Sequence, residues 1–395
     1  MGALTGIRVL DAGLLVQGPQ AAQTLADMGA DVIKIELPVI GDQSRWIPSS
    51  PDDNRSGFFQ ACNRGKRSVA LDLRTADGSE AFLRLVDTAD VVIANFSVGT
   101  MEEWGVGYET AAARNPGIIY GLGSTLGTEG PHATREGVDL VAQAMGGLIS
   151  TTGRTDEAPT PVGVTIADHI GSQNLTVGVL AALVARTATG RGQRIDVSLL
   201  GGQIYAQASE YTSYFLSGSV PGRADQGHPL IRAIYGVFAT SDGHIGVLPS
   251  GSRRAAFFEI MGMPELDVDE RLATLWMTAT DRRAILDRLA PVFLERTTAE
   301  WRDVLTAADV RCAPVNDYAS ASEDPHASAN GYIAEVEHPE WGPMRSIGSP
   351  IRMSETPPES GITAPTLGAH TTEILAEIGY SADDIDAMRA SGAVA

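Results

Sequence analysis

Cysteine is scarce in this sequence, since only Cys62 and Cys312 among its 395 residues are cysteines. Two cysteines exclude a disulfide framework and a cysteine-rich metal centre, so both are expected to be small core residues, and no metal site is predicted. The sequence also lacks an apolar run of the roughly 20 residues that span a membrane. Its first residues lack the order of charged, apolar and small residues that marks a signal peptide. These absences predict a soluble protein of the cytoplasm, without a membrane partner.

Basic residues are few as well, with 29 lysines and arginines against 49 aspartates and glutamates, which gives a formal net charge of −20. Such a charge repels nucleic acids and anionic membranes from most of the surface, so neither is expected as a partner. An anionic ligand would need positive side chains that are clustered against this field. The candidate cluster is Asn63-Arg64-Gly65-Lys66-Arg67-Ser68 with Arg74 farther along, and the alternative is a solvated basic turn.

Short β-branched segments alternate with helical stretches through the first third of the chain. This alternation is typical of βαβ units with right-handed crossovers and a mainly parallel sheet, in which ligands collect at the carboxyl ends of the strands. The turn at residues 13–19 lacks the G-x-G-x-x-G spacing, and no P-loop pattern occurs, which argues against a nicotinamide or flavin enzyme. The expected strands are residues 7–11, 31–36, 68–73, 91–95 and 118–121, and the expected helices lie near residues 21–28 and 78–88.

The length of the chain exceeds the size at which a single core usually stops growing, so two domains are expected. A Gly- and Pro-rich segment at residues 217–229 is interpreted as a linker. It separates a large Rossmann-like α/β domain, whose first part is residues 1–216, from a smaller α+β domain over residues 230–325. The smaller domain contains a predicted hairpin at 236–248, and residues 326–395 are expected to return to the large domain.

One acid stands out between Pro161 and Gln173, where an apolar segment delivers Asp168 to the start of a long apolar helix expected at residues 171–188. A short acid at this place can cap the helix by accepting hydrogen bonds from its free N–H groups. A half-buried carboxylate near a helix start can also attack an activated acyl group as a nucleophile. The local sequence leaves both roles open.

The order and spacing of motifs over almost the whole chain resemble those of class III CoA-transferases. This family includes formyl-CoA transferase and carnitine CoA-transferase, and it also contains α-methylacyl-CoA racemase. No single motif is diagnostic, but together they are highly specific. They are Leu4-x-Gly-x-Arg-Val-Leu-Asp11, residues 25–36, Gly41-Asp42, Asn63 to Ser68, Asn95-Phe96, Gly99 to Met101, Gly137 to Met145, Asp168, Thr189 to Gln193, Asp196 to Leu200, His228-Pro229, Cys312 to Asp317 and Gly348 to Arg352.

The resemblance implies a Rossmann-like large domain, a small domain and an interlocked homodimer whose active site forms between subunits. It assigns to Asp168 the role of nucleophile, which would carry an acyl anhydride and then a CoA thioester, so that CoA passes from an acyl-CoA to a free carboxylic acid. No tightly bound cofactor is then required. Backbone N–H groups at the helix start beyond Asp168 and in the turn at 13–19 are the expected oxyanion donors.

The resemblance also implies a set of binding residues. The residues expected to meet the phosphates of CoA are Arg64, Lys66, Arg67 and Arg74. Those expected at its adenine end are Asn95, Phe96 and Met101. The expected lining of the substrate pocket is Gln17, Val138, His169, Tyr235, Leu248 and Ser252.

A racemase is the main alternative within the family, and it needs proton-transfer groups on both faces of the substrate. Val138 stands where racemases carry a histidine, and residues 248–254 lack the glutamate expected there. Both departures argue against racemisation. His169 remains the candidate for a variant base, although packing is its simpler role.

A CoA-binding protein without catalysis is the second alternative, because a fold does not guarantee a chemistry. Departures from the family pattern permit it: Gln17 replaces an alanine, and Val138 replaces an aromatic residue that transferases often carry. Ser97 replaces a common arginine, which weakens one expected contact to a phosphate or the adenine. The presence of Asp168 weighs against it. Residues 249–252, around Ser250, lie where some transferases have a mobile lid, but they are poor in glycine.

Overall fold

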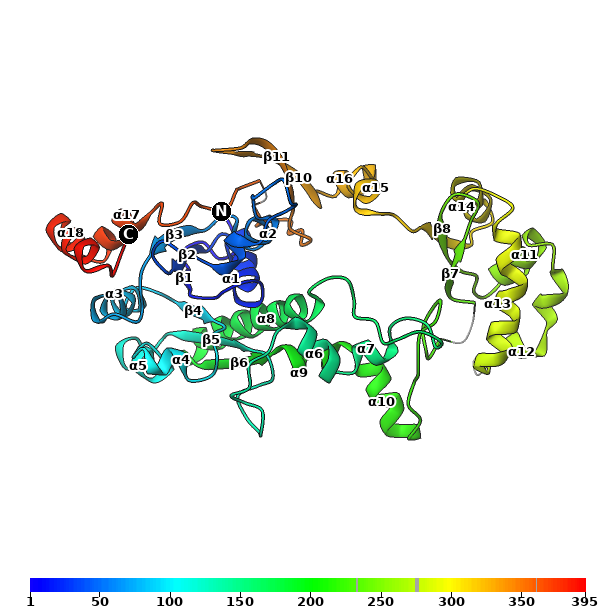
Figure 1. Ribbon diagram of the computed structural model, residues 1–395, viewed down its shortest axis with the longest axis horizontal. Helices are drawn as coiled ribbons and strands as arrows, with labels where there is room; N and C mark the ends of the chain where they lie inside the picture. The colour runs from blue at the N-terminus through cyan, green and yellow to red at the C-terminus, as the bar shows by residue number, and fades with distance from the viewer. Residues whose placement is uncertain (232–233, 274–276, 360) are drawn as a thin grey trace. The chain divides into compact units, whose positions relative to one another are not determined.

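The computed structural model describes residues 1–231, 234–273, 277–359 and 361–395 (Figure 1). The chain divides into two compact units. The first unit comprises residues 1–146, 164–206 and 324–395, and the second comprises residues 147–163 and 207–323. This division differs from the predicted boundary after residue 216, because residues 207–216 and 147–163 belong with the second unit.

A six-stranded parallel sheet forms the centre of the first unit, in the order β3-β2-β1-β4-β5-β6. The predicted α/β fold with a parallel sheet is therefore confirmed. The strand order reverses between β1 and β4, and the loops that follow such a pair of strands are the usual place for a ligand. The strands are β1 (Arg8–Asp11), β2 (Asp31–Glu36), β3 (Arg67–Ala70), β4 (Val91–Ala94), β5 (Ile119–Ser124) and β6 (Arg194–Ser198).

Helices surround this sheet, and an antiparallel hairpin, β10–β11, follows late in the chain. The remaining elements of the first unit are α1 (Gln17–Asp27), η1 (Gln43–Trp46), α2 (Gly57–Asn63), α3 (Ala76–Val86), α4 (Thr100–Glu103), α5 (Tyr108–Arg114), α6 (Asp139–Met145), α8 (Ile166–Thr189), α9 (Leu199–Ala206), α16 (Pro325–Ala329), β10 (Ile333–His338), β11 (Gly342–Ile347), α17 (Thr371–Glu377) and α18 (Ala382–Ser391).

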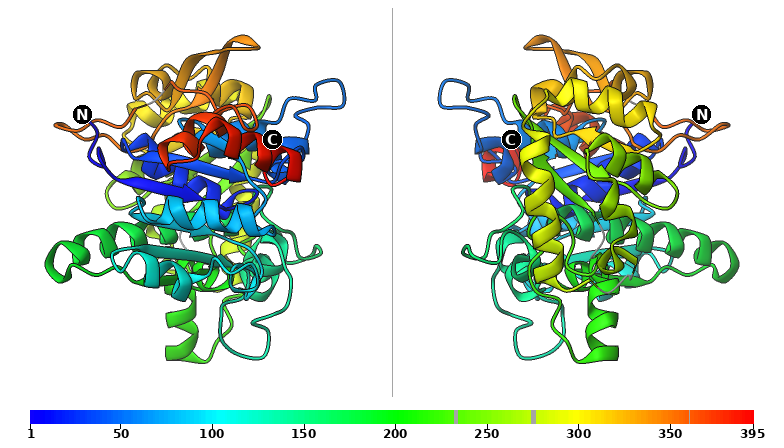
Figure 2. Two further views of the ribbon diagram at one scale, coloured as in Figure 1. Left: turned by 90° about the vertical axis from the view of Figure 1, so that its left-hand side faces the viewer. Right: turned by 90° about the vertical axis from the view of Figure 1, so that its right-hand side faces the viewer.

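The two faces of the sheet are covered by different helices, as the pleat of β1 illustrates. Leu10 belongs to a core that includes residues of α3, α17 and α18. Val9 belongs to a second core that includes residues of α1 and α8. Successive residues of a strand face opposite sides of the sheet, so the apolar strands supply both layers. Figure 2 shows the C-terminal helices against the first strands.

The second unit is built on a three-stranded antiparallel sheet in the order β7-β8-β9. Its core includes Phe238, Phe257, Phe293 and Trp301, which are almost wholly buried. The predicted hairpin corresponds to β7 and β8. The elements are α7 (Leu148–Thr151), α10 (Ala208–Ser217), β7 (Gly236–Ala239), β8 (His244–Leu248), α11 (Arg253–Ile260), η2 (Pro264–Val268), α12 (Glu270–Ala273), α13 (Ala279–Phe293), α14 (Thr298–Ala307), β9 (Arg311–Pro314) and α15 (Tyr318–Ser322).

The helix α6 ends at Met145, and Gly147 then takes a left-handed conformation with φ +81°. The helix expected at 171–188 begins earlier, at Ile166, so that Asp168 is its third residue. The helix α8 has 24 residues, yet none of the helices in the described parts of the chain is long and apolar enough to cross a membrane.

Candidate active site

Asp168 lies in the first turn of α8, where the helix dipole favours a negative charge. Its carboxylate is half-buried. The sequence left open whether this acid caps the helix, but the cap comes from another element. Asp139, the first residue of α6, accepts hydrogen bonds at Oδ1 from the backbone N–H groups of Ala167, at 2.7 Å, and Asp168, at 3.3 Å. The capping role therefore belongs to Asp139, and the Asp168 carboxylate is not used for it.

The second oxygen of Asp139 is also engaged, since Oδ2 accepts a hydrogen bond from Nε2 of Gln143 at 2.6 Å. This contact fixes the carboxylate of Asp139 against the start of α8. The oxyanion donors were expected beyond Asp168, so the bonds of Ala167 and Asp168 to Asp139 do not test that expectation. The first N–H group beyond Asp168, that of His169, donates to the carbonyl of Thr165 at 3.1 Å.

The pKa of Asp168 is raised to about 7, mainly because burial disfavours its charged form and secondarily because the negative charge of Asp139 lies close by. A carboxylate with so high a pKa is a better nucleophile than an ordinary aspartate, and it still carries a substantial ionised fraction at neutral pH. Strongly shifted acids of this kind are typical of functional sites. The electrostatics thus distinguish Asp168 from a surface acid.

His169 joins the first turn of α8 to α1. Its Nδ1 lies 2.6 Å from Oε1 of Gln20, and its Nε2 lies 3.4 Å from the hydroxyl of Thr165. An amide oxygen only accepts, so Nδ1 carries the hydrogen. Burial lowers the pKa of His169, while Asp139 acts in the opposite direction. These contacts anchor the first turn of α8 beside Asp168.

Three side chains bind the backbone of the loop after β1 by hydrogen bonds. The backbone N–H groups of residues 13–15 donate to Asp11 at 2.9 Å, to Asn95 at 2.7 Å and to Asp42 at 3.1 Å. Asn95 also donates through Nδ2 to the carbonyl of Leu14 at 2.9 Å. The three N–H groups are thereby occupied, which corrects the expectation that this part of the turn stabilises an oxyanion. Asn95 acts as a brace for the loop.

The beginning of α1 offers the free donors that the loop lacks. The backbone N–H groups of Gln17 and Gly18 make no hydrogen bond to any described residue, and no side chain caps this helix. The side chain of Gln17 is 3 % exposed. It lies between Gly123 of β5 and Gly171 of α8, where an added Cβ at either glycine would crowd its amide. Its Nε2 is buried without a partner among the described residues.

Two cavities open at the carboxyl ends of the parallel strands. The smaller one, of about 170 Å³, is lined by Arg74, Phe96 and Trp104 among others, and the rings of Phe96 and Trp104 meet edge to face at 4.9 Å. The larger one, of about 390 Å³, is lined by Phe96 again, by Ser97 and by Val138. Phe96 thus borders both cavities. Val138 directly precedes Asp139 in the sequence, but neither Asp139 nor Asp168 is among the described residues that line this cavity.

A family model described as CoA-transferase family III matches residues 4–371. The chain belongs to this family. It is 36% identical over 402 residues to the succinyl-CoA:mesaconate CoA-transferase of Haloarcula marismortui, with 96% of this chain and 97% of the relative covered. It is also 36% identical over 390 residues to the succinate–glutarate CoA-transferase of Agrobacterium fabrum, with 95% of each covered. The protein is therefore an enzyme that transfers CoA, with CoA thioesters as substrates.

A solved structure agrees with this assignment. The crystal structure of a CAIB/BAIF family protein from Brucella suis is 33% identical in sequence and superposes with a TM-score of 0.85. The match covers 95% of this chain and 99% of that chain. Fold and sequence therefore point to the same family of transferases.

Most of the basic side chains expected to bind the phosphates of CoA form ion pairs with carboxylates of the protein itself. Arg64 is 5 % exposed and forms a two-bonded ion pair with Asp27, at 3.0 and 2.5 Å. Arg67 is shared among Asp31, Glu373 and Glu377. A phosphate would have to displace these carboxylates. The geometry does not support Arg64 or Arg67 as CoA contacts.

Lys66 is the clearest correction within this cluster, because it is 4 % exposed. Its ammonium donates to Asp11 at 2.6 Å, to the carbonyl of Pro19 at 2.8 Å and to Asn63 at 2.7 Å. These contacts use all three hydrogens of the ammonium group. Burial lowers the pKa of Lys66 to about 8. Lys66 therefore ties the start of α1 to β1 and has no hydrogen left for a phosphate.

The remaining members of the predicted CoA set behave differently from one another. Arg74 keeps a side chain that is 58% exposed and pairs only with Asp72, at 2.7 Å. It lines the smaller cavity together with Phe96. Met101, in contrast, is 2 % exposed and belongs to the hydrophobic core. Arg74 and Phe96 therefore remain the candidates for CoA contacts.

Three residues of the predicted substrate pocket lie in the second unit. Tyr235 is half-exposed and meets His228 edge to face, with ring centroids 6.4 Å apart. Leu248 ends β8. Ser252 is the residue before α11 and caps nothing with its side chain. In the loop between them the hydroxyl of Ser250 accepts a long hydrogen bond from Arg311, at 3.4 Å.

Sequence reasoning missed the role of Asp139 altogether. Within the motif Gly137-Val138-Asp139 only the middle residue entered the prediction, because it distinguishes racemases from transferases. A usable signal was present, since a helix without a capping side chain of its own needs an acceptor from elsewhere. Thr165, the residue before α8, makes no such hydrogen bond.

Proposed function

We propose that Asp168 is the nucleophile through which this enzyme passes CoA from an acyl-CoA to a free carboxylic acid. One observation carries the proposal. The carboxylate of Asp168 is half-buried, its pKa is raised to about 7, and among the described residues neither the helix nor a cation pairs with it. A structural acid in such a place would be capped or paired, as Asp139 is.

Four acyl-transfer steps complete the cycle. In each step one anion attacks a carbonyl carbon and another anion leaves it. The Asp168 carboxylate attacks the thioester carbonyl, the C–S bond breaks, and an aspartyl anhydride and the CoA thiolate result. The thiolate attacks the aspartyl carbonyl and releases the first acid as a carboxylate. The acceptor carboxylate then displaces the thiolate from the aspartyl thioester, and the thiolate finally attacks the acceptor's acyl carbon. Asp168 is regenerated, and no proton is gained or lost.

The two cavities of the first unit support a path for CoA. Arg74 and the aromatic edge of Phe96 suit a phosphate and an adenine ring in the smaller cavity. Phe96 also lines the larger cavity, and so does Val138, which precedes Asp139 in the sequence. Asp139 in turn binds the start of α8. We propose that CoA follows this line of residues, with its thiol end at Asp168.

The N–H groups of Gln17 and Gly18 are the proposed oxyanion donors. They are free among the described residues and belong to a helix that packs against α8. A helix start also presents a partial positive charge to an anion. The buried Nε2 of Gln17 is a third donor without a partner in the described parts of the chain. Such donors stabilise the charge that develops on a carbonyl oxygen under attack.

Dicarboxylic acids are the proposed class of acceptor. The two relatives described above are named for succinate, mesaconate and glutarate, which all carry two carboxyl groups. The exposed Val138 at the larger cavity leaves room for a short acyl chain. One methylene changes binding in an apolar pocket by only about 1–3 kcal/mol, so we expect a preference among these acids and not an absolute choice.

An interlocked homodimer is the proposed assembly. Large apolar side chains are exposed on α8, α9 and α10. Their exposure in a single chain supports burial against a second copy. Light scattering after gel filtration would report a dimer, and a monomer at micromolar concentration would contradict it. The side chains are Val177, Val184, Tyr205, Phe215 and Leu216, with exposures of 66%, 70%, 75%, 73% and 84%.

We further propose that the enzyme works in the cytoplasm and without a tightly bound cofactor. Cys62 and Cys312 are free thiols, as expected in a reducing compartment. The cycle passes one thioester to the next and thus needs no other group.

The direct test incubates the protein in deuterated water with succinyl-CoA and a panel of carboxylic acids, and follows every acyl-CoA by mass spectrometry. We expect new acyl-CoAs without deuterium. Asp168→Asn should lose at least a thousandfold in turnover, whereas the exposed control Asp77→Asn should keep it. Deuterium at the α-carbon of unchanged acyl-CoA would instead mean racemisation, and binding without turnover in the wild type would mean a non-catalytic protein.

A further inference from the structure

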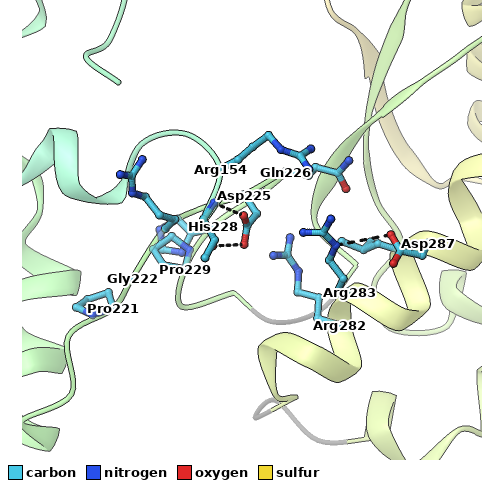
Figure 3. Close-up of a pocket in the computed structure, with 13 residues that line it drawn as sticks. Arg154, Pro221, Gly222, Asp225, Gln226, His228, Pro229, Arg282, Arg283 and Asp287 are labelled. Atoms are coloured by element: carbon cyan, nitrogen blue, oxygen red, sulfur yellow. Dashed lines mark hydrogen bonds and ion pairs between the residues drawn. The ribbon is translucent and has the colours of Figure 1, made fainter. Parts of the chain in front are cut away.

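The second unit contains a cavity of about 390 Å³ that concentrates positive charge (Figure 3). Its walls come from the segment around residues 154–155, from residues 221–229 and from the helix α13. Figure 3 shows the side chains of Arg282 and Arg283 extending from α13 toward the segment that carries Asp225. The charged groups of the lining are Arg154, Arg223, Arg282, Arg283, Asp225 and Asp287.

Arg282 is the least compensated of these charges. It is 8 % exposed. Its Nη2 donates to the carbonyl of Tyr235 at 2.9 Å, but its Nε is buried without a partner among the described residues. Burial lowers the pKa of Arg282, and among the described residues the charge of Asp225 opposes this effect. A buried guanidinium is costly unless anions and hydrogen bonds satisfy it.

The aspartates of the cavity do not neutralise its arginines. Asp225 accepts hydrogen bonds from the backbone N–H and the hydroxyl of Thr155, at 2.8 and 3.1 Å. Asp287 lies 3.9 Å from Arg283 on the exposed side of α13, too far for a hydrogen bond. The acids thus leave most guanidinium donors unused.

The other two arginines are held in place without a carboxylate inside the cavity. Arg223 donates from Nη1 to the carbonyls of Thr152, at 2.9 Å, and Ala158, at 3.2 Å. Arg154 has its Nε 3.3 Å from Asp156 and 3.5 Å from Glu157, two acids outside the lining. These acids balance the lining's four arginines and two aspartates in number. Arg282 and Arg283 nevertheless have no carboxylate within hydrogen-bond distance among the described residues.

The shape and charge of the cavity narrow the class of ligand. Pro221, Pro229 and Leu286 line it together with the charged groups, so one wall suits a short hydrocarbon chain. Guanidinium groups are planar and bind carboxylates with two parallel hydrogen bonds. Two carboxylates match the guanidinium groups of Arg282 and Arg283, which have no carboxylate within hydrogen-bond distance among the described residues. The basic cluster predicted from the sequence does not offer such available positive groups, because Arg64 and Lys66 form ion pairs with aspartates of the protein.

We propose that this cavity binds a short dicarboxylate, with Arg282 and Arg283 as its principal contacts. The inference rests on the proposed function for the identity of the ligand, since dicarboxylic acids are the proposed acceptor class. It goes further by assigning recognition of the acid to named residues of the second unit. None of these residues was singled out by the sequence.

Calorimetric titration of the full-length protein with glutarate tests the proposal without any turnover. We expect saturable binding, at least tenfold weaker binding of butyrate, which has one carboxylate, and no displacement of glutarate by adenosine 3′,5′-bisphosphate, which carries the phosphates of CoA's nucleotide end. Arg283→Gln and Arg154→Gln should each weaken glutarate binding several-fold. Because Arg282 is buried, Arg282→Lys is the variant of choice there, and its melting temperature is measured beside its affinity.

Arg288→Gln is the matched control. Arg288 lies on the same helix, is paired with Glu265 at 2.5 Å and does not line the cavity, so glutarate should bind this variant as it binds the wild type. Equal affinity of the wild type, Arg283→Gln and Arg154→Gln would overturn the proposal, and so would displacement by the bisphosphate. If glutarate binds as expected while CoA transfer is absent, the proposed function fails and the cavity stands. If CoA transfer occurs while glutarate binding is unaltered in the variants, the cavity fails as a dicarboxylate site and the proposed function stands.

Discussion

Asp139 accepts a hydrogen bond at Oδ1 from the backbone N–H of Asp168, and so one acid holds the backbone of another. Asp139 also accepts from Ala167, which makes it the cap of α8. Its negative charge is the second cause, after burial, of the raised pKa of Asp168. Position and ionisation of the proposed nucleophile thus depend on one neighbouring side chain.

Replacing Asp139 with asparagine should separate these two effects. The amide oxygen of Asp139→Asn still accepts from the start of α8, but the negative charge is gone. The rate requires ionised Asp168, so in the wild type kcat/KM should rise with pH through about 7. In the variant burial still raises the pKa but the charge no longer does, so the midpoint should move to lower pH by up to about one unit.

The pH profile of the exposed Glu109→Gln variant is the control for this shift, because Glu109 lies in α5, away from α8. It should retain the wild-type midpoint. The groups that face Asp168 from other elements include Cys62 of α2, whose pKa is raised by burial, so the same measurement is made on Cys62→Ser. A midpoint that stays fixed in Asp139→Asn would contradict the electrostatic coupling.

Lys66→Met should destabilise the fold rather than weaken CoA binding. The substitution leaves the buried carboxylate of Asp11 without its nearest cation and frees the carbonyl of Pro19. Breaking a buried ion pair from one side costs about 3–5 kcal/mol. Urea unfolding measures this loss. An unchanged free energy of unfolding combined with a raised KM for acyl-CoA would restore Lys66 as a phosphate contact.

Arg74→Gln, in contrast, should weaken CoA binding and leave the stability of the fold almost unchanged. Its side chain is 58% exposed, and an exposed ion pair such as Arg74 with Asp72 contributes at most about 1 kcal/mol. The melting temperature should therefore hardly change, while KM for acyl-CoA rises about tenfold, the size of one charge-assisted contact to phosphate. Arg302→Gln, which removes an exposed arginine from the second unit, should change neither quantity. An unaltered KM in Arg74→Gln would remove the smaller cavity from the CoA path.

Gln17→Met should raise stability and lower activity. The buried Nε2 of Gln17 has no partner among the described residues, and an unsatisfied buried donor costs about 1–3 kcal/mol. Methionine has a similar shape and lacks the donor. If Nε2 serves the developing oxyanion, kcat should fall by about tenfold or more while the free energy of unfolding increases. A variant with both quantities raised would show that the donor has no part in catalysis.

The sequence predicted the features that depend on local pattern. The parallel sheet followed from alternating segments, and Asp168 followed from a helix start and a family motif. The internal ion pairs of the basic cluster could not be predicted, because the aspartates that form them are distant in the chain. Arg64 pairs with an aspartate 37 residues away and Lys66 with one 55 residues away, and only the assembled sheet brings these groups together.

The cap of α8 escaped prediction for a related reason. Its acceptor, Asp139, precedes Ala167 by 28 residues, across a segment that belongs to the second unit. Capping rules consider residues next to the helix, so they pointed to Asp168 itself. The local pattern therefore favoured a capping role for Asp168 that the structure assigns to Asp139.

The most direct test of the account is the covalent intermediate itself. The protein is incubated with succinyl-CoA, quenched in acid and examined by intact-mass and peptide mass spectrometry, beside Asp168→Asn. The account predicts an increase by the mass of CoA less water, located on the peptide that contains Asp168, removed by hydroxylamine and absent from the variant. Turnover without any such adduct, or an adduct on another residue that persists in Asp168→Asn, would contradict it.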